Sequence, residues 1–432
     1  MKKVAFYLDN SAIRATDCSK ALDGNPGIGG TEWLFVAVSS LLTNRDNDVD
    51  VVLYTPTPGT FPKGICNVVV ENLPEAIVLA DSLGFDYLVV KHLADNITKG
   101  MFEVRTKHLQ FICWCHVFVC HWELDYYSNN EVFSKVVFVG REMYDLYRDH
   151  KIYHKATYIY NCVPSGDARE LVQQIPLCKR ENVVAYVGSL VPFKGFHLLA
   201  QAWPKILQQV PDAKLYVIGS GRLYNKDSHL GKWGIAEESY EDAFMPFLTQ
   251  SGKIISSVHF MGVMGDEKKN ILLKSRVGVP NPSGITETFC LSAVEMQMYG
   301  CRIATINFPG YMDTVRNGRL YNRKGNLATV IVELLQSSEN YYVSSMDYFE
   351  ENFSYESVIT KWEELIKTGN ICYADKLTNL CYRFKWLKEL LRIIKRHLPF
   401  LYYMPMVERI LIFIERRVYG KATNIDSNIS IG

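Results

Sequence analysis

The chain has 432 residues, of which 48% are hydrophobic and 22% are charged, and its 47 basic residues almost balance its 46 acidic ones. This length favours two or three domains, and the balanced charge provides no global field that would gather nucleic acid, so nucleic acid is not an expected partner. Eleven scattered cysteines without a C-x-x-C pair indicate a reducing, cytoplasmic compartment. No run of about eighteen uncharged apolar residues predicts a membrane-spanning helix.

Short apolar runs separated by helical stretches occupy the first part of the chain. This pattern is typical of a parallel sheet built from β-α-β units. The runs are residues 4–8, 51–54, 87–90, 111–114, 136–139 and 158–160. A helix is expected over residues 33–42, and a polar stretch from about residue 166 to residue 181 predicts a linker.

The same pattern restarts after residue 181, with helices expected at 197–208 and 291–299. The predicted strands are residues 183–187, 214–218, 258–261, 277–279 and 302–305. The fold class is therefore α/β, with two doubly wound Rossmann-like lobes and a cleft at the carboxyl ends of their strands. We assign residues 1–165 to the first lobe, 166–345 to the second, and 346–368 to a helix that crosses back onto the first lobe.

The remaining residues, 369–432, form a tail of different character. Between residues 376 and 419 there are ten basic residues and only three acidic ones, mixed with aromatic and aliphatic residues. Such a composition suits helices lying in the headgroup plane of an anionic membrane. The alternative is a helical hairpin packed on the protein itself or on a dimer partner.

The most informative stretch runs from residue 282 to residue 295 and carries two carboxylates, Glu287 in a loop and Glu295 on the helix that follows. Because unpaired backbone N–H groups at the start of that helix favour anions, a phosphate is expected there. A carboxylate on each side suits a nucleotide-sugar, with one acid near the sugar ring and the other accepting hydrogen bonds from the ribose.

Two segments of the first lobe also point to a ligand. A glycine-rich loop over residues 24–32 precedes the helix at 33–42 and would let the backbone approach a ligand, although its glycines lack the dinucleotide-binding spacing and an inert turn is the alternative. His116 ends the fourth apolar run and is expected at the carboxyl edge of the sheet. A buried histidine paired with His121 or Glu123 is the alternative.

In the second lobe, Lys194 lies between a strand and a helix and could present its ammonium group to a diphosphate. Arg222 is a second candidate cation, and a solvated loop lysine is the common alternative.

Two metal-like patterns carry little weight. The segment Cys113-x-Cys115-His116 continues a buried strand, which favours packing, and Asp48-x-Asp50 follows a polar turn, so no metal site is expected.

Together these segments resemble the retaining family-4 glycosyltransferases of the two-lobed GT-B fold, over roughly residues 1–366. The most specific features are the E-x7-E pair, Glu287 and Glu295, and the G-x-L-x-x-x-K-G segment that contains Lys194. The resemblance implies a retaining, metal-independent hexosyltransferase without a cofactor. Its donor would be a nucleotide-sugar, with UDP favoured, held by the second lobe, and its acceptor would be held by the first lobe.

The resemblance also implies residue roles. His116 would bond the transferred sugar, Lys194 the diphosphate, and Glu287 would orient and stabilise the sugar. The implied substrate-binding residues are Gly29, Gly30, Ser189, Gly221, Arg222, Val263, Thr288, Phe289, Cys290, Leu291 and Glu295. The chain departs from the family pattern at Ser189, where arginine is usual, and at Cys290, where glycine is usual. Arg222 or Arg276 is the hypothesised source of the missing charge.

The leading functional hypothesis is a transferase for envelope polysaccharide, such as lipopolysaccharide, that works as a peripheral protein on the cytoplasmic membrane face. The tail is the reason for choosing a lipid-linked acceptor. One alternative is a transferase that makes a storage or osmolyte glycan. Another is a catalytically silent nucleotide-sugar-binding partner, which the departures at Ser189 and Cys290 motivate.

Overall fold

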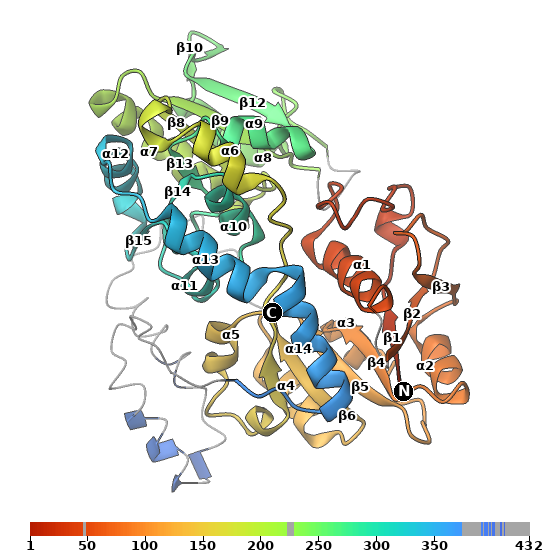
Figure 1. The fold of residues 1–432 in the computed structure, drawn as a ribbon. Coiled ribbons are helices and arrows are strands. Elements are labelled where there is room, and N and C mark those ends of the chain that lie inside the picture. Colours follow the sequence, from red (N-terminus) through yellow and green to blue (C-terminus); the bar gives the residue numbers. More distant parts are fainter. Residues whose placement is uncertain are drawn as a thin grey trace.

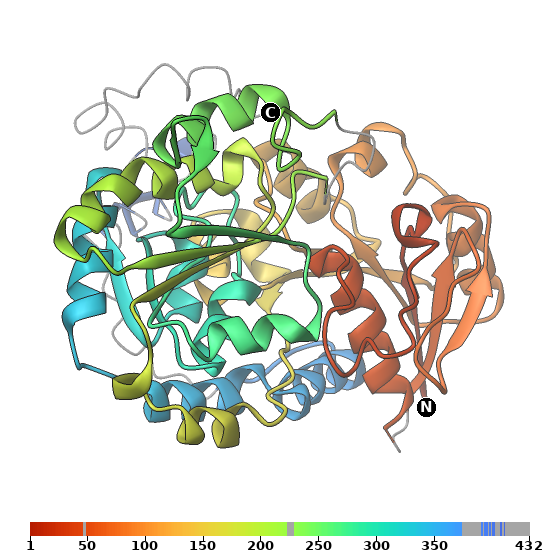
Figure 2. The ribbon, with the colours of Figure 1, turned by 90° about the horizontal axis from the view of Figure 1, so that it is seen from above.

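The computed structural model describes residues 1–45, 49–222 and 229–373, together with residues 390, 391, 393–395, 397, 398, 400, 401, 407 and 410. Two wholly parallel sheets form two Rossmann-like lobes, the second above the first in Figure 1 and beside it in Figure 2. This arrangement confirms the predicted fold class. Most of the predicted tail, residues 369–432, lies outside the described residues.

The first lobe is built on a seven-stranded sheet with the order β3-β2-β1-β4-β5-β6-β7. Its strands are β1 (Lys2–Tyr7), β2 (Val49–Thr55), β3 (Cys66–Val69), β4 (Tyr87–Lys91), β5 (Gln110–Cys115), β6 (Phe133–Phe138) and β7 (Ala156–Tyr158). All six predicted strands are present, with bounds that shift by a few residues. The strand β3 was not predicted, because it lies at the sheet edge and none of its residues is buried.

The helices of the first lobe cover both faces of this sheet, as expected for a doubly wound lobe. They are α1 (Gly30–Thr43), α2 (Leu73–Ser82), α3 (Ala94–Thr98), α4 (His121–Asn129) and α5 (Arg141–Leu146). Helix α1 is apolar around most of its circumference and is correspondingly buried. It contacts strand β2 and, from the later part of the chain, helix α14 (Tyr355–Thr368).

The second lobe is built on a six-stranded sheet with the order β12-β9-β8-β13-β14-β15, and the short antiparallel pair β10 (Thr249–Gln250) and β11 (Lys253–Ile254) lies outside it. The six strands are β8 (Val183–Val187), β9 (Lys214–Ile218), β12 (Val258–Gly262), β13 (Val277–Val279), β14 (Arg302–Ile306) and β15 (Gly318–Tyr321). The five predicted strands are present. Strand β15 was missed because only its last two residues are apolar.

The helices of the second lobe are α6 (Ala168–Gln174), α7 (Phe196–Gln209), α8 (Glu238–Phe244), α9 (Lys269–Leu272), α10 (Leu291–Met298), α11 (Pro309–Thr314) and α12 (Leu327–Gln336). Helix α6 corrects the prediction of a linker up to residue 181. Its polar residues are mainly exposed or half-buried, whereas Ala168 and Val172 are buried. Composition alone therefore hid a short amphipathic helix.

Two helices follow the second sheet and return the chain to the first lobe (Figure 1). They are α13 (Tyr342–Phe353) and α14 (Tyr355–Thr368), and the Ser354 side chain between them caps α14. The Trp362 ring of α14 lies 6.0 Å from the Phe6 ring and 4.8 Å from the Trp114 ring, between centroids. Among the described residues, no helix combines the length and the apolarity that a membrane crossing requires.

Candidate active site

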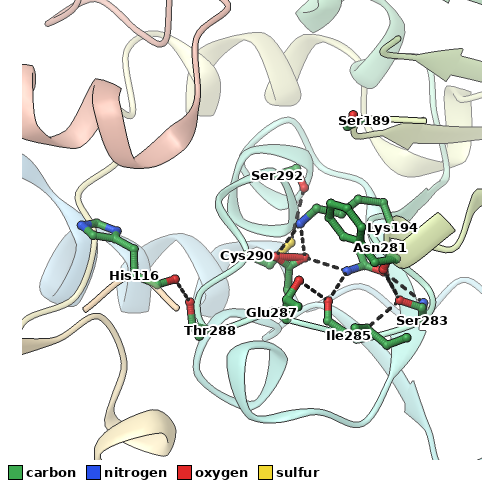
Figure 3. Close-up of polar contacts among 12 residues, drawn as sticks. His116, Ser189, Lys194, Asn281, Ser283, Ile285, Glu287, Thr288, Cys290 and Ser292 are labelled. Atoms are coloured by element: carbon green, nitrogen blue, oxygen red, sulfur yellow. Dashed lines mark hydrogen bonds and ion pairs between the residues drawn. The ribbon is translucent and has the colours of Figure 1, made fainter. Parts of the chain in front are cut away.

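The predicted acid Glu287 and the predicted cation Lys194 meet at the carboxyl edge of the second sheet (Figure 3). Lys194 Nζ lies 3.0 Å from Glu287 Oε1 and 3.3 Å from Oε2. The two side chains are only 16% and 11% exposed. Since a buried charge is costly without a partner, each of the two groups offsets the cost of burying the other. The pairing joins segments 93 residues apart in sequence.

A glycine makes this approach possible. Gly195, directly after Lys194, has φ of 69° and lies against the backbone of Ser283, whose nitrogen would be 2.7 Å from a Cβ at position 195. Any larger residue would therefore push the two loops apart. The Ser283 hydroxyl donates to the carbonyl oxygen of Phe193 at 2.5 Å and completes the contact.

The loop that carries Glu287 is strained. Thr286 has φ of 64°, a left-handed conformation that is uncommon for a β-branched residue. Such a conformation costs on the order of 1–3 kcal/mol and persists only where surrounding contacts impose it. Its position next to Glu287 indicates that the orientation of this carboxylate is what the strain secures.

Two further residues hold Glu287, and neither was predicted. Asn281 Nδ2 donates to Glu287 Oε2 at 3.2 Å. The Tyr311 hydroxyl donates to the Asn281 carbonyl at 2.7 Å and lies 3.4 Å from the same carboxylate oxygen. Burial, with smaller effects from Cys290 and Glu287, raises the pKa of Tyr311 well above its usual range, so the phenol remains a donor. Asn281 could have been inferred from its place after strand β13. Tyr311 lies on α11, and no local pattern marks it.

The N-termini of two helices meet beside this network, one from each lobe. Helix α1 begins at Gly30 and helix α10 at Leu291, and a Cβ on Gly30 would lie 3.0 Å from Leu291 Cδ1. Gly29 is the N-cap of α1. Because helix N-termini present unpaired N–H groups and a positive dipole, this junction favours an anion.

His116 lies at the carboxyl end of β5, where it was predicted. Its carbonyl oxygen accepts a hydrogen bond from Thr288 Oγ1 at 2.7 Å, which links the first lobe to the Glu287 loop (Figure 3). Burial, reinforced by nearby Lys91, lowers the pKa of His116 well below its usual value, so the imidazole is neutral. Its Nε2 is buried and has no hydrogen-bond partner within the described residues.

Helix α11 of the second lobe makes a second contact with the first lobe, next to the Glu287 loop. Asp313 on α11 accepts hydrogen bonds from the backbone N–H of Glu142 at 2.9 Å and from the Tyr160 hydroxyl at 3.1 Å, both in the first lobe. Burial raises the pKa of Asp313 to about 6. On the same helix, Gly310 packs so closely on the Glu287 carbonyl that a Cβ would lie 2.6 Å from its oxygen.

Three other predicted residues have partners within the protein. Glu295 Oε1 lies 2.9 Å from Lys268 Nζ. The Ser189 hydroxyl donates to the Ser220 carbonyl at 3.2 Å, apart from the Glu287 network. Cys290 Sγ lies 3.3 Å from Ser292 Oγ, and burial raises the pKa of this thiol to about 12.

Four further predicted residues differ in how much of each can reach a ligand. The Phe289 ring is buried against Phe353, at 5.0 Å between centroids, so only its backbone can reach the site. Gly221 packs against the backbone of Ala236, and Val263 follows β12 and is 58% exposed. Arg222 is exposed after β9, next to residues 223–228, which are outside the description.

The hypothesis that Arg276 supplies charge to the site is wrong. Arg276 precedes β13 and therefore lies at the amino edge of the sheet, whereas Glu287 follows its carboxyl end. Its guanidinium donates to the Leu335 carbonyl at 2.6 Å and serves as a structural donor there. For the pattern Asp48-x-Asp50, Asp48 lies outside the described residues and Asp50 is part of β2.

The comparisons with known proteins agree with the two-lobed architecture. Residues 167–341, which contain the second sheet, match the family model described as Glycosyl transferases group 1. A curated relative, an uncharacterized glycosyltransferase of Haemophilus influenzae, is 24% identical over 216 residues. That alignment covers 48% of this chain and 55% of the relative, so the chain spans about half of the relative's length.

Solved glycosyltransferase-like structures share the fold. The Alr3699/HepE protein of Anabaena in complex with UDP-glucose aligns with a TM-score of 0.61 and 16% identity, covering 85% of this chain and 100% of that one. A glycosyltransferase of Rickettsia africae aligns with a TM-score of 0.60 and 12% identity, covering 85% and 98% respectively. The chain therefore has the GT-B fold.

Proposed function

We propose that this protein is a retaining glycosyltransferase that moves a sugar from a UDP-sugar to a glycan or lipid-linked acceptor. The observation that carries the proposal is the buried Lys194–Glu287 pair, placed beside the junction of two helix N-termini from different lobes. The similarity of residues 167–341 to the family Glycosyl transferases group 1 supports it. The choice of UDP is supported by the likeness to a protein solved with UDP-glucose.

In this proposal the donor diphosphate lies between the starts of α1 and α10, where backbone N–H groups and Lys194 offset its growing negative charge. Glu287 stabilises the positive charge that develops on the sugar ring as the bond to phosphate breaks. Neutral His116 offers its unpartnered Nε2 to a sugar hydroxyl. The departing phosphate takes the acceptor's proton.

Release of nucleoside diphosphate from a panel of UDP-, GDP- and ADP-sugars tests the activity. We expect turnover with at least one UDP-sugar, and thermal stabilisation by UDP, because a ligand that binds only the folded state shifts the unfolding equilibrium. Stabilisation by UDP without release of UDP from any donor, even with lipid extracts as acceptor, would instead identify a catalytically silent binding partner.

We further propose that the tail brings the enzyme to the cytoplasmic face of an anionic membrane, where a lipid-linked glycan would be extended. Five apolar side chains of the tail are between 39% and 68% exposed. They are Leu390, Ile393, Ile394, Leu398 and Phe400. Lys395 and Val407 of the tail are buried and contact Asp149 of the first lobe, so part of the tail packs on the protein itself. The exposed apolar side chains remain available to a membrane surface, as is typical of a surface-bound segment.

Flotation with vesicles distinguishes this role from a dimer interface. The full chain is expected to float with phosphatidylglycerol vesicles, to lose that binding at high salt, and to stay behind with neutral phosphatidylcholine vesicles. A variant without residues 374–432, which keeps the Tyr373 ring stacked on Tyr158, should not float. A full chain that fails to float and elutes as a dimer, while the truncated chain is a monomer, contradicts the membrane role.

A further inference from the structure

A buried polar cluster in the first lobe plays no part in the proposed transfer reaction. Cys113 and Cys115 lie two residues apart on β5, so their side chains point to the same face of the sheet. His92 directly follows the neighbouring strand β4, and its backbone N–H donates to the Trp114 carbonyl at 3.0 Å. Strand pairing therefore brings the imidazole beside both thiols.

The geometry of this cluster matches that of a tetrahedral zinc ion. One ligand atom from each of His92, Cys113 and Cys115 lies within 4.8 Å of the others, and the two sulfur atoms are 3.8 Å apart. Zn–S bonds of about 2.3 Å in a tetrahedron place two sulfur ligands roughly 3.8 Å apart. Glu123 Oε2 lies 3.5 Å from His92 Nε2, within reach as a fourth group.

The surroundings also fit an enclosed structural site. His92, Cys113, Cys115 and Glu123 are each at most 4% exposed, on a face packed with aromatic rings. The Tyr127 hydroxyl lies 2.7 Å from His92 Nδ1, the kind of outer hydrogen bond that orients a ligating imidazole.

We propose that His92, Cys113 and Cys115 bind a zinc ion, with the Glu123 carboxylate completing the site. The sequence favoured packing for Cys113 and Cys115, and the metal-like pattern that contains them joined them to His116. In the folded chain the histidine beside the two cysteines is His92, not His116, and it lies 21 residues before Cys113 in the sequence. The ion ties the ends of β4 and β5 together directly before His116, and so gives the first lobe a structural support that is independent of the transfer chemistry.

A second group of residues has metal-binding geometry, but it differs from the buried cluster because a lysine already pairs with its carboxylate. His121, Asp125 and His150 also lie within 4.8 Å of one another. However, Lys151 Nζ is 2.9 Å from Asp125 Oδ1 and already neutralises that carboxylate. The buried cluster has no such lysine among its described contacts. His92 is the single basic group placed against its two thiols and its carboxylate. The zinc proposal is therefore confined to the buried cluster.

Metal content tests the proposal on the full chain, purified without chelators and dialysed against a weak one. Elemental mass spectrometry should find about one zinc ion per chain in the wild type, as for a structural site. The matched control Cys162→Ser, at another buried cysteine of the same lobe, should keep its zinc. The variant Cys113→Ser/Cys115→Ser should lose it. Zinc retained in this double variant overturns the proposal.

The wild type provides a second measurement if the double variant fails to fold. Protein produced with Co²⁺ should show a thiolate-to-cobalt charge-transfer band and the visible bands of a tetrahedral ion. Added Zn²⁺ should replace the cobalt and raise the unfolding temperature of chelator-treated protein. A folded wild type that contains no metal and takes up neither ion, or one that carries a Cys113–Cys115 disulfide, overturns the proposal.

Discussion

Replacing Glu287 by glutamine is expected to reduce kcat by about 10²–10³-fold, the size of effect seen when a charge-stabilising group is removed from an active site. The amide has nearly the same shape and can still bond Asn281 and Tyr311, but it carries no charge for the sugar ring or for Lys194. Steady-state release of UDP, measured at saturating donor, gives kcat directly.

The matched control for this change is Glu333→Gln. Glu333 also pairs with a cation, Arg319, but the pair is exposed, with side chains 46% and 42% accessible. Exposed pairs contribute little, so this variant should have wild-type activity and stability. Glu287→Gln should in addition bind UDP within a few-fold of the wild type, because the proposed nucleotide contacts are made by other residues. Activity of Glu287→Gln within threefold of the wild type contradicts the role assigned to this carboxylate.

Replacing Trp362 by alanine is expected to destabilise the protein by about 3–5 kcal/mol, the usual cost of emptying a large buried site. Trp362 is fully buried and packs against Phe6 and Trp114, where α14 crosses onto the first lobe. Because α13 and α14 connect the second sheet to the first lobe, the change should also loosen the lobes and lower activity. Urea unfolding and UDP release measure the two effects.

A milder variant separates packing from any other role of this residue. Trp362→Phe keeps an aromatic ring and removes an indole N–H that is buried without a partner in the described part of the chain. It should lower the free energy of unfolding by well under half as much as Trp362→Ala does. It should also retain activity. A destabilisation by Trp362→Ala as small as that of an exposed substitution, about 0.5 kcal/mol or less, would show that α14 does not hold the lobes together.

The sheets could be read from the sequence because parallel strands are buried on both faces and appear as continuous apolar runs. Strands such as β8 and β9 were predicted with their observed bounds. The exceptions are physically consistent. Strands β3 and β15 end the two sheets, and helix α6 has only two buried residues, so none of them needs a strong apolar signal.

The parts of the candidate site that follow from local sequence were also found. Lys194 and Glu287 each stand in a loop after a strand, and parallel strands bring such loops to one edge of a sheet. Asn281 and Tyr311, which hold the carboxylate, were not found. Asn281 lies two residues after strand β13 and was overlooked. The contact of Tyr311 depends on how α11 packs against the Glu287 loop, which residue type and spacing do not encode. The same limit explains why Arg276 was placed in the site although it lies at the opposite edge.

By itself, the sequence determined the two α/β lobes, the loops that carry chemistry and the acids and cations within them, because periodicity and turn residues act over short distances along the chain. Tertiary structure decided which of these groups meet. It paired Lys194 with Glu287 and brought the starts of α1 and α10 together. It also placed His92, rather than His116, beside Cys113 and Cys115. These pairings arise from strand order and lobe packing, which bring together residues that are distant in the chain.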